Sequence, residues 1–361
     1  MVYISSIGIA PPKHRFPQAY VKTLVQKIFQ LPEEKISRLL PVFDHALVNE
    51  RQLVVDEEWL QGDHTFAERN KLYQTNALTY SLKAMDHCLT NSTFLNTPFP
   101  YEAIDMICFV SSTGVSTPTI DAYLMNERPF RNDVIRLPLW GLGCAGGAIG
   151  LARAFDWLKA HPDKNALIIC CELCSLTFQK QDLKKSNLIG AALFGDGISC
   201  ALLLGEQSPY INYHQGKKPV IQHASSYMKK QTLDLMGWHV TNSGLEVIFS
   251  KNIPALLDTI WQEHFRVFLL SLHKGVEDFD SFIVHPGGPK ILTTLEKIGQ
   301  IEPVKLRYSY QVLKDHGNMS SVTIFYVLYQ WMLHHEELHQ SLLTALGPGF
   351  SSELLYLEWV S

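Results

Sequence analysis

Short apolar runs alternate with longer amphipathic stretches along most of this chain. The apolar runs are bounded by Gly, Pro or polar residues and predict buried strands; they cover residues 2–9, 104–110, 166–171, 198–204, 282–285 and 353–359. Apolar residues at helical spacing predict helices; these stretches cover residues 65–91, 151–158, 252–273 and 322–332, with a mixed, mainly helical segment at 15–60. Strands that alternate with helices indicate an α/β protein in which helices pack in layers against sheets.

A polar segment separates two parts of the chain that share this rhythm. Residues 205–240 are polar and contain Gly, Pro and Lys, which favours a boundary there. A chain of 361 residues is too long for one small core, so two subdomains or a duplicated fold are expected. We therefore predict an N-terminal half at residues 1–215 and a C-terminal half at residues 216–361.

One stretch combines a glycine-rich turn with a reactive side chain. Trp140 looks like a buried strand residue that leads into Gly-Leu-Gly-Cys-Ala-Gly-Gly, and an amphipathic helix follows. Cys144 then lies on the first turn of that helix, where free N–H groups and the helix dipole favour an anion. We expect its thiol to ionise more easily than free cysteine, whose pKa is about 8.5, and to act as a nucleophile. The alternative is a buried structural cysteine.

Composition and charge narrow the class of protein. Hydrophobic residues make up 46% of the chain and charged residues 18%, as in well-packed globular proteins. A net charge of −4 gives no footprint for a polyanion, so we expect no nucleic-acid partner. No apolar run reaches the length of a membrane span, and the start of the chain lacks the basic region of a signal peptide. The seven cysteines, an odd number in mostly apolar settings, favour reduced thiols and a cytoplasmic location.

Two further motifs place polar side chains beside predicted elements. His285 follows a strand and precedes Pro-Gly-Gly, at the carboxyl end where α/β proteins place reactive groups; a structural turn histidine is the alternative. Asn318 lies in Gly-Asn-Met-Ser-Ser before an apolar helix, where it could serve only as an N-cap, as could Ser320 or Ser321. Brought together with Cys144, the two side chains would donate hydrogen bonds to an oxyanion in an acyl-transfer site.

Two patterns mimic other sites. His335-Glu-Glu-Leu-His339 matches a zinc-protease motif, but no third ligand follows at a familiar spacing, so a solvated helix end is the better interpretation. Cys171-Glu-Leu-Cys174 has the spacing of a redox dithiol, but it lies at the end of a buried strand rather than at a helix start after one, which favours a packed strand end. We expect no metal.

Six motifs in register carry a family resemblance over nearly the whole chain, from about residue 3 to 360. They are Gly-Cys-Ala-Gly-Gly at Cys144, Cys-Glu-Leu-Cys-Ser-Leu-Thr-Phe at 171–178, Phe-Gly-Asp-Gly at 194–197, His-Pro-Gly-Gly at 285–288, Gly-Asn-Met-Ser-Ser at 317–321 and Gly-Pro-Gly at 347–349. In this order and spacing the chain resembles the chalcone-synthase-like type III polyketide synthases.

The resemblance implies a fold, an assembly and a chemistry. The fold is thiolase-like, with two related α-β-α-β-α halves in five layers, and the assembly is a homodimer. Cys144 would be the nucleophile and acyl carrier, while His285 and Asn318 would promote decarboxylation of malonyl-CoA. Acyl-CoA and malonyl-CoA would be substrates, and no bound cofactor would be needed.

Other positions follow from the same resemblance. Phe194 matches a gatekeeping aromatic between the CoA tunnel and the cavity, and Val247 stands where plant relatives carry a second aromatic. Thr177, Ser320 and Cys174 match positions that line the cavity. Thr117 matches a residue that reaches into the partner's cavity. Four positions match CoA contacts: Arg51, Gly287, Gly288 and Lys290. The plain alternatives are a core phenylalanine at 194 and solvated surface charges at Arg51 and Lys290.

Small side chains at Cys174 and Val247 would leave apolar room in the cavity. This favours a long aliphatic acyl starter, two or three malonyl-CoA extensions and closure to an alkylpyrone. Closure to an alkylresorcinol remains open. A β-ketoacyl-carrier-protein synthase of the initiation type also uses Cys, His and Asn on this fold, but the Gly-Asn-Met-Ser-Ser and Gly-Pro-Gly motifs favour the polyketide class. A hydroxymethylglutaryl-CoA synthase would need a glutamate near the nucleophile, and the motif set contains none at a matching position.

Overall fold

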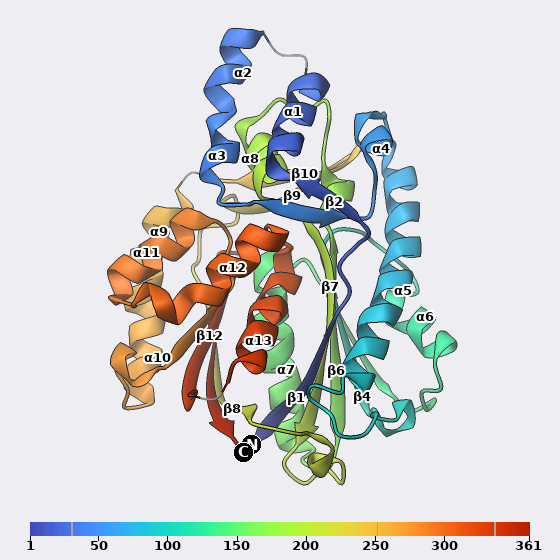
Figure 1. Cartoon of the computed structure of the whole chain (residues 1–361), viewed down its shortest axis with the longest axis vertical. Coiled ribbons are helices and arrows are strands. Elements are labelled where there is room, and N and C mark those ends of the chain that lie inside the picture. The colour runs from blue at the N-terminus through green and yellow to red at the C-terminus, as the bar shows by residue number, and fades with distance from the viewer. Residues whose placement is uncertain (30–31, 251, 336) are drawn as a thin grey trace.

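The computed structural model describes every residue except 30–31, 251 and 336, and its centre is a single large sheet (Figure 1). The sheet has nine strands in the order β11-β12-β13-β8-β1-β7-β6-β4-β5, with parallel and antiparallel neighbours. Their bounds are Val2–Ile9 (β1), Met106–Ser111 (β4), Ile135–Trp140 (β5), Asn165–Leu173 (β6), Asp196–Gly205 (β7), Lys218–Met228 (β8), Ser281–Val284 (β11), Gln340–Gly347 (β12) and Ser351–Val360 (β13).

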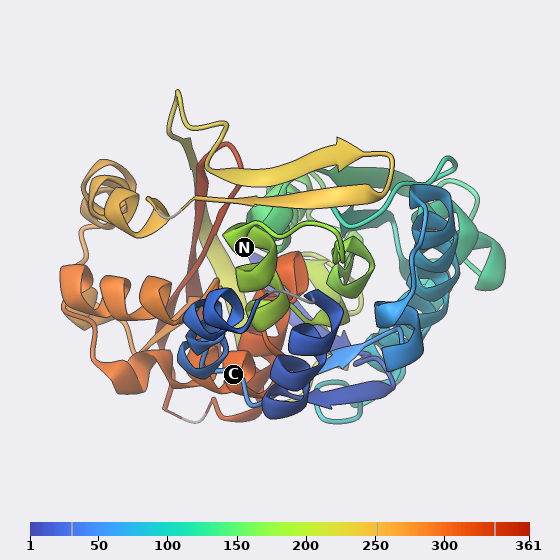
Figure 2. The same ribbon diagram turned by 90° about the horizontal axis from the view of Figure 1, so that it is seen from above.

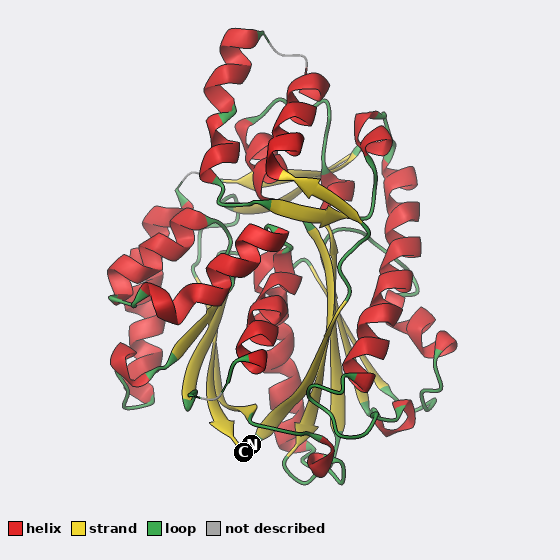
Figure 3. Ribbon diagram, viewed as in Figure 1, coloured by secondary structure: helices red, strands yellow, loops and turns green. Residues whose placement is uncertain are grey.

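Helices divide this sheet into an N-terminal part and a C-terminal part. Two central helices, α7 (Gly146–Ala160) and α13 (Thr323–Leu333), contact strands of both parts. The long helix α5 (Phe66–Thr90) covers the outer face of β1, β6 and β7. The outer face of the other part is covered by α9 (Ile253–Ile260), α10 (Arg266–Ser271) and α11 (Pro289–Gly299), with α12 (Arg307–His316) beside α13 (Figures 1 and 3). From one side to the other, the layers are α5, the N-terminal part of the sheet, the central helices, the C-terminal part of the sheet and the outer helices. The predicted thiolase-like α/β fold is confirmed.

The strands alternate their side chains between two of these layers, as the pleat requires. In β6, Ile168 and Cys170 pack toward the central helices, whereas Leu167 and Ile169 pack toward α5. All nine residues of β6 are buried, because both faces of the strand are covered. A continuous apolar run was therefore the right signal for this strand.

A cap of small elements lies over one end of the sheet. It contains α1 (Gln18–Phe29), α2 (Glu33–Leu39), α3 (Pro41–His45), α4 (Glu57–Gln61) and the two-stranded ribbon of β2 (His14–Pro17) and β3 (Glu50–Leu53). Beside it, β9 (Met236–Thr241) and β10 (Gly244–Phe249) form a hairpin that packs against α8 (Lys185–Leu193) (Figure 2). Shorter helical turns in the chain that matter below are η2 (Gly143–Ala145) and η3 (Cys174–Thr177).

The structure adds one feature to the predicted boundary segment and corrects one other expectation. Within residues 205–240, β8 joins β1 to β13 at the centre of the sheet. Trp140 is 53% exposed, because it ends the edge strand β5 rather than a buried strand. The division into halves at 215 and 216 stays a prediction.

Candidate active site

Cys144 lies in a tight turn between an edge strand and a buried helix. Gly141 and Gly143 have φ angles of +84° and +48°, which side chains beyond glycine rarely adopt. The Gly143 N–H donates to Ser112 Oγ at 3.0 Å. A Cβ at Gly347 would lie 2.7 Å from the Leu142 carbonyl oxygen, so the Gly-Pro-Gly loop packs directly on the turn. The glycines let the chain turn sharply and present the thiol at the start of α7.

Burial, rather than the helix dipole, dominates the thiol. Cys144 is 7% exposed, and burial raises its pKa to about 11, although hydrogen bonding from Ser320 and Asn318 works in the opposite direction. The expectation of an easily ionised cysteine is thus wrong for the unliganded site. The group rests as a thiol, and its proton has to be removed before it can attack an acyl-CoA.

His285 follows β11 and lines a small cavity that Cys144 also lines. Its backbone N–H donates to the Thr344 carbonyl at 2.9 Å, which continues the strand pairing by one residue. Burial lowers its pKa to about 3, so the imidazole is neutral near pH 7. Neither ring nitrogen has a hydrogen-bond partner among the described residues. A neutral ring with both nitrogens uncommitted can accept a proton at one and donate a hydrogen bond at the other.

Asn318 is fully buried and its amide orientation is fixed by two neighbours. Its Oδ1 accepts from the Ser320 N–H at 2.8 Å, and its Nδ2 donates to the Gly287 carbonyl at 3.2 Å. Its amide lies 3.9 Å from Cys144 Sγ. Nδ2 thus also donates weakly toward the sulfur, and an oxyanion that forms beside the sulfur can take over this hydrogen bond. Asn318 is therefore more than a helix cap.

A small apolar cavity holds the three predicted catalytic side chains. Cys144, His285 and Asn318 line it together with Gly287, and the remaining lining residues are apolar: Met236, Phe249, Ile253, Ile291, Leu346 and Phe350. Met236 and Phe249 come from the hairpin, so residues distant in sequence close the site. Few waters fit beside these side chains, and hydrogen bonds to a developing charge are stronger in such a setting.

Phe194 stands between this cavity and a larger one. It lies at the end of α8, and its backbone forms a parallel bridge with Asn318. Its ring packs edge-on against Trp238, with centroids 6.4 Å apart at 63°. Trp238 faces Val247 across the β9–β10 hairpin. The strand paired with Val247 thus places an aromatic ring against Phe194, a contact that the sequence did not reveal.

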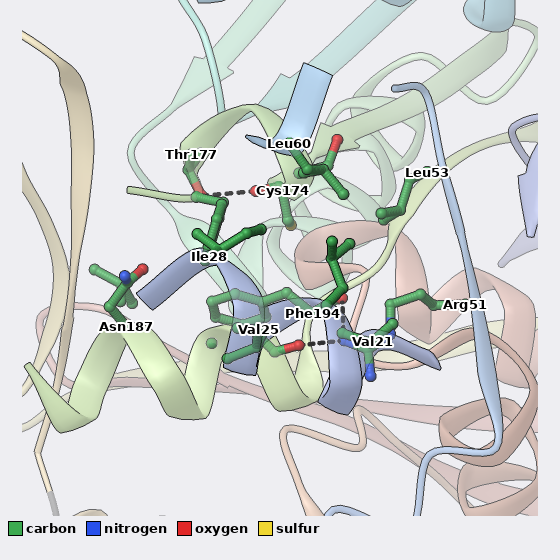
Figure 4. Close-up of a pocket in the computed structure, with 16 residues that line it drawn as sticks. Val21, Val25, Ile28, Arg51, Leu53, Leu60, Cys174, Thr177, Asn187 and Phe194 are labelled. Atoms are coloured by element: carbon green, nitrogen blue, oxygen red, sulfur yellow. Dashed lines mark hydrogen bonds between the residues drawn. The ribbon is translucent and has the colours of Figure 1, made fainter. Parts of the chain in front are cut away.

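The larger cavity is open to solvent, and the empty space in and around it, open solvent included, is about 600 Å³ (Figure 4). Cys174, Thr177, Phe194 and Val247 line it as predicted. Its other lining residues come mainly from α1 and α8 and from nearby turns; they are Val21, Leu24, Val25, Ile28, Arg51, Leu53, Leu60, Ser175, Phe178, Asn187, Gly190 and Ala191.

The position of Arg51 does not suit a side chain that binds the phosphates of CoA. It is 1% exposed, and its guanidinium donates to the carbonyl oxygens of Ala191 at 2.7 Å, Ala192 at 2.8 Å and Phe194 at 2.9 Å, and to Gln18. Burial lowers its pKa to about 9. Arg51 therefore holds the end of α8 in place, and the geometry speaks against both a CoA contact and a surface charge.

The other predicted positions fall in different settings. Lys290 is exposed on the first turn of α11, Gly288 is buried just before it, and Ser320 is buried with a φ of +49° while its N–H holds Asn318. Thr117 is exposed on a loop of this chain. Contacts of these residues with CoA, an acyl chain or a second subunit stay predictions.

Glu172 is a buried group that the sequence reasoning passed over. It is fully buried, and it accepts hydrogen bonds from Ser321 Oγ at 2.6 Å and from the Ser112 N–H and Thr113 Oγ1, both at 3.0 Å. Burial raises its pKa to about 7. The sequence signal that could have revealed Glu172 was a single carboxylate within an apolar strand. Because Ser112 also accepts from Gly143, Glu172 supports the nucleophile turn through an intermediate residue.

The two mimicking patterns resolve differently. Cys171 lies two residues before the end of β6, Cys174 begins η3, and both are free, buried thiols, so the packed strand end is confirmed. Helix α13 ends at Leu333, so His335 and His339 are not on one helical face, and Glu336 lies outside the described residues. Among the residues that the structure describes, no group of three His, Cys, Asp or Glu side chains could hold a metal ion.

Comparisons with known proteins decide the family. Residues 2–207 match the domain described as "Chalcone and stilbene synthases, N-terminal domain", and residues 221–360 match the corresponding C-terminal domain. The chain belongs to the chalcone and stilbene synthase family of type III polyketide synthases. It is 43% identical over 361 residues to a Bacillus subtilis protein named "Putative chalcone synthase", covering 99% of both chains.

Two other relatives show the range of this type III polyketide synthase family. The crystal structure of the 1,3,6,8-tetrahydroxynaphthalene synthase of Streptomyces coelicolor superposes with a TM-score of 0.88 at 27% identity, covering 99% of both chains. A Mycobacterium tuberculosis protein named for α-pyrone synthesis, Pks18, is 25% identical over 362 residues, covering 97% of this chain and 89% of its own. The polyketide class is therefore confirmed, and this synthase is an acyltransferase that condenses malonyl-CoA with an acyl-CoA. Over the described residues, no helix of the synthase is both long and apolar enough to cross a bilayer.

Proposed function

We propose that this synthase loads a long-chain acyl group from acyl-CoA onto Cys144, extends it with two or three malonyl-CoA units, and releases an alkylpyrone. The observation that carries the proposal is the apolar cavity behind Phe194. Its polar lining groups are already engaged: Thr177 donates to the Cys174 carbonyl at 2.8 Å, and Asn187 donates to the carbonyls of Gln179 and Asp182. What remains for a ligand is aliphatic and aromatic surface.

The proposed steps use only the three side chains of the small cavity. As the Cys144 sulfur attacks the acyl-CoA carbonyl, a nitrogen of neutral His285 takes the thiol proton, and CoA thiolate then leaves with a proton. Malonyl-CoA then loses CO2, and the electron pair of the broken bond forms an enolate on the thioester oxygen. Hydrogen bonds from His285 and Asn318 to that oxygen contribute about 3–4 kcal/mol each.

The carbon–carbon bond forms when the enolate carbon attacks the Cys144 thioester carbonyl. The Cys144 thiolate leaves, and the chain, longer by two carbons, is now held on CoA. Transfer of the chain back to Cys144 allows another round. In the last step an enol oxygen of the chain attacks the terminal thioester carbonyl, a lactone forms, and the thiol is released with a proton. Phe194 lines the larger cavity and Phe249 lines the small one, and an apolar ring beside the malonyl carboxylate would favour its release as neutral CO2.

A product without an alkyl chain is the second candidate, because the Streptomyces coelicolor relative is a tetrahydroxynaphthalene synthase. Such a product needs no long apolar starter. Product mass spectrometry with malonyl-CoA alone, and with malonyl-CoA plus a panel of acyl-CoAs, separates the two. Alkylpyrones that inherit the length of the starter are expected. Naphthalene products from malonyl-CoA alone, unaffected by acyl-CoA, would overturn the proposal, and alkylresorcinols would keep the starter but change the ring closure.

We also propose a cytoplasmic homodimer, supported by the edge strand β5. This strand closes one end of the sheet and exposes Ile135 (47%) and Trp140 (53%), with Val115 (43%) close by in the chain that precedes it. An exposed apolar edge strand is a template for pairing with another chain. All seven cysteines are free thiols, as in a reducing compartment.

A further inference from the structure

Helix α1 forms one complete wall of the larger cavity. Val21, Leu24, Val25 and Ile28 all line it, at the spacing i, i+3, i+4 and i+7 that places side chains on one helical face. The four are 3–9% exposed, whereas Thr23, Gln26 and Lys27 on the same helix face solvent. The wall therefore consists of aliphatic side chains alone, and it offers a ligand no hydrogen bond.

The ends of this helix are tied to two different parts of the site. At its start, Gln18 Nε2 donates to the Ala192 carbonyl at 3.0 Å. Arg51 donates both to this carbonyl and to the carbonyl of Phe194. At its end, the ring of Phe29 meets that of Phe178 at 5.8 Å. Seven residues from Val21 to Ile28 rise about 10 Å. The wall thus runs from Val21, beside Phe194, to Ile28, beside Thr177 (Figure 4).

The opposite wall is constrained by catalysis. Phe194 is bound through its backbone to Asn318, and Cys174 lies close to the nucleophile. A change of side-chain size there also moves catalytic groups. The inner face of α1 touches neither Cys144, His285 nor Asn318 in the small cavity, so its side chains can change the volume of the larger cavity alone.

From this arrangement we propose that the inner face of α1 sets the length of the acyl starter, with Ile28 as a boundary residue. The inference rests on the proposed loading of acyl-CoA and adds the residues that select among starters. An acyl chain inside the cavity gains free energy for each methylene it buries, and a larger side chain on α1 removes space for the last methylenes. Each methylene of the acyl chain that no longer fits in the cavity should lower acylation of Cys144 about fourfold.

The test compares opposite changes at one position. Purified wild type, Ile28→Ala and Ile28→Phe are each mixed with acyl-CoAs of graded length, without malonyl-CoA, and acylation of Cys144 is followed by intact-protein mass spectrometry. Ile28→Ala should shift the preferred length upward and Ile28→Phe should shift it downward. Val25→Ala and Val25→Phe provide a second pair should one variant fold poorly. Lys27→Ala, an exposed change on the same turn, should leave the profile unchanged.

Two failures can be told apart. If wild type acylates Cys144 with long-chain acyl-CoAs but both members of a pair change all lengths by the same factor, α1 is only a structural support and the inference is wrong. If wild type accepts no long-chain acyl-CoA, the proposed function itself is wrong and the inference falls with it. That second result is visible in the wild-type profile alone.

Discussion

The three reactive side chains gain their properties from burial rather than from charge. Cys144 is kept protonated and His285 is kept neutral because the same apolar lining removes water from both. This pairing suits a site that binds two CoA thioesters in turn. A neutral imidazole can take the thiol proton while the sulfur attacks, and it can later donate to an enolate, whereas a permanent ion pair would hold the proton on the ring.

Alkylation of Cys144 tests this resting state. Because burial raises the pKa of the thiol to about 11, its reaction with iodoacetamide should accelerate about tenfold per pH unit from pH 7 to 10, with no plateau. Peptide mass spectrometry of Cys144 measures the rate, and Cys144→Ser serves as the control. A plateau below pH 8 would show a stabilised thiolate and contradict the account.

Replacing Asn318 should separate loading from extension. In Asn318→Ala, decarboxylation of malonyl-CoA should fall about 100- to 1,000-fold, because one of two donors to the enolate is gone, while acyl transfer to Cys144 falls less. Decarboxylation is measured by CO2 release and loading by intact mass. Asn96→Ala, which removes an exposed amide, is the matched control. Equal loss in both steps would assign Asn318 a role in folding the site instead.

At the scale of residues, sequence motifs revealed which side chains form the site but not what surrounds each of them. Cys144, His285 and Asn318 could be found because glycine and proline turns mark the ends of their elements. The direction of the Cys144 pKa depends on Met236 and Phe249, which reach the site from a remote hairpin. The burial of Arg51 likewise depends on carbonyls at the end of α8, which no local pattern predicts.

At the scale of elements, α8 lines the larger cavity and ends at Phe194, whose backbone pairs with that of Asn318. Gly190 lies on α8, and a Cβ there would meet the Phe194 ring at 3.2 Å and Val247 at 3.6 Å. The glycine thus leaves room for the ring that separates the cavities. The hairpin of β9 and β10 was not predicted, because its residues lie in or beside a segment whose polarity favoured a boundary between halves. The pairing of Trp238 with Val247 shows its role.

Gly190→Ala should narrow the larger cavity. Helix α8 tolerates alanine and gains about 1 kcal/mol in helix propensity, so the variant should fold. Steady-state kinetics should show a larger loss of kcat/KM for long acyl starters than for short ones, since Phe194 and Val247 are pushed into the cavity. Lys185→Ala on the same helix is the control. An unchanged preference for starter length would show that the neighbours yield without narrowing the cavity.

At the scale of the whole molecule, the sheet brings two distant halves of the chain together. Cys144 follows β5 in the N-terminal part, while His285 and Asn318 belong to elements beyond residue 280. The alternation of strands and helices was enough to predict an α/β protein with helices layered on sheets, and the family resemblance added the thiolase-like order of five layers. The strand order was not predictable, because β8 and β1 join the two parts by a pairing that no periodicity encodes.

The exposed edge of β5 leads to a prediction about assembly. Ile135→Glu should weaken the proposed dimer, because a buried, unpaired carboxylate at the interface is costly. Light scattering after size exclusion should give twice the chain mass for wild type and a shift toward the single chain for the variant. Val304 is 55% exposed and follows β11, which lies at the opposite end of the sheet from β5. The Val304→Glu variant should therefore remain dimeric. A wild type that runs as a single chain would refute the dimer.

The most direct test of the central claim is rapid-quench mass spectrometry of the peptide that contains Cys144, during turnover with a long-chain acyl-CoA and malonyl-CoA. The account predicts a series on this one cysteine: the starter, then the starter extended by one and by two acetate units, all absent in Cys144→Ala. A starter that never reaches Cys144, or a reaction that stops after a single condensation, would contradict iterative polyketide synthesis on this residue.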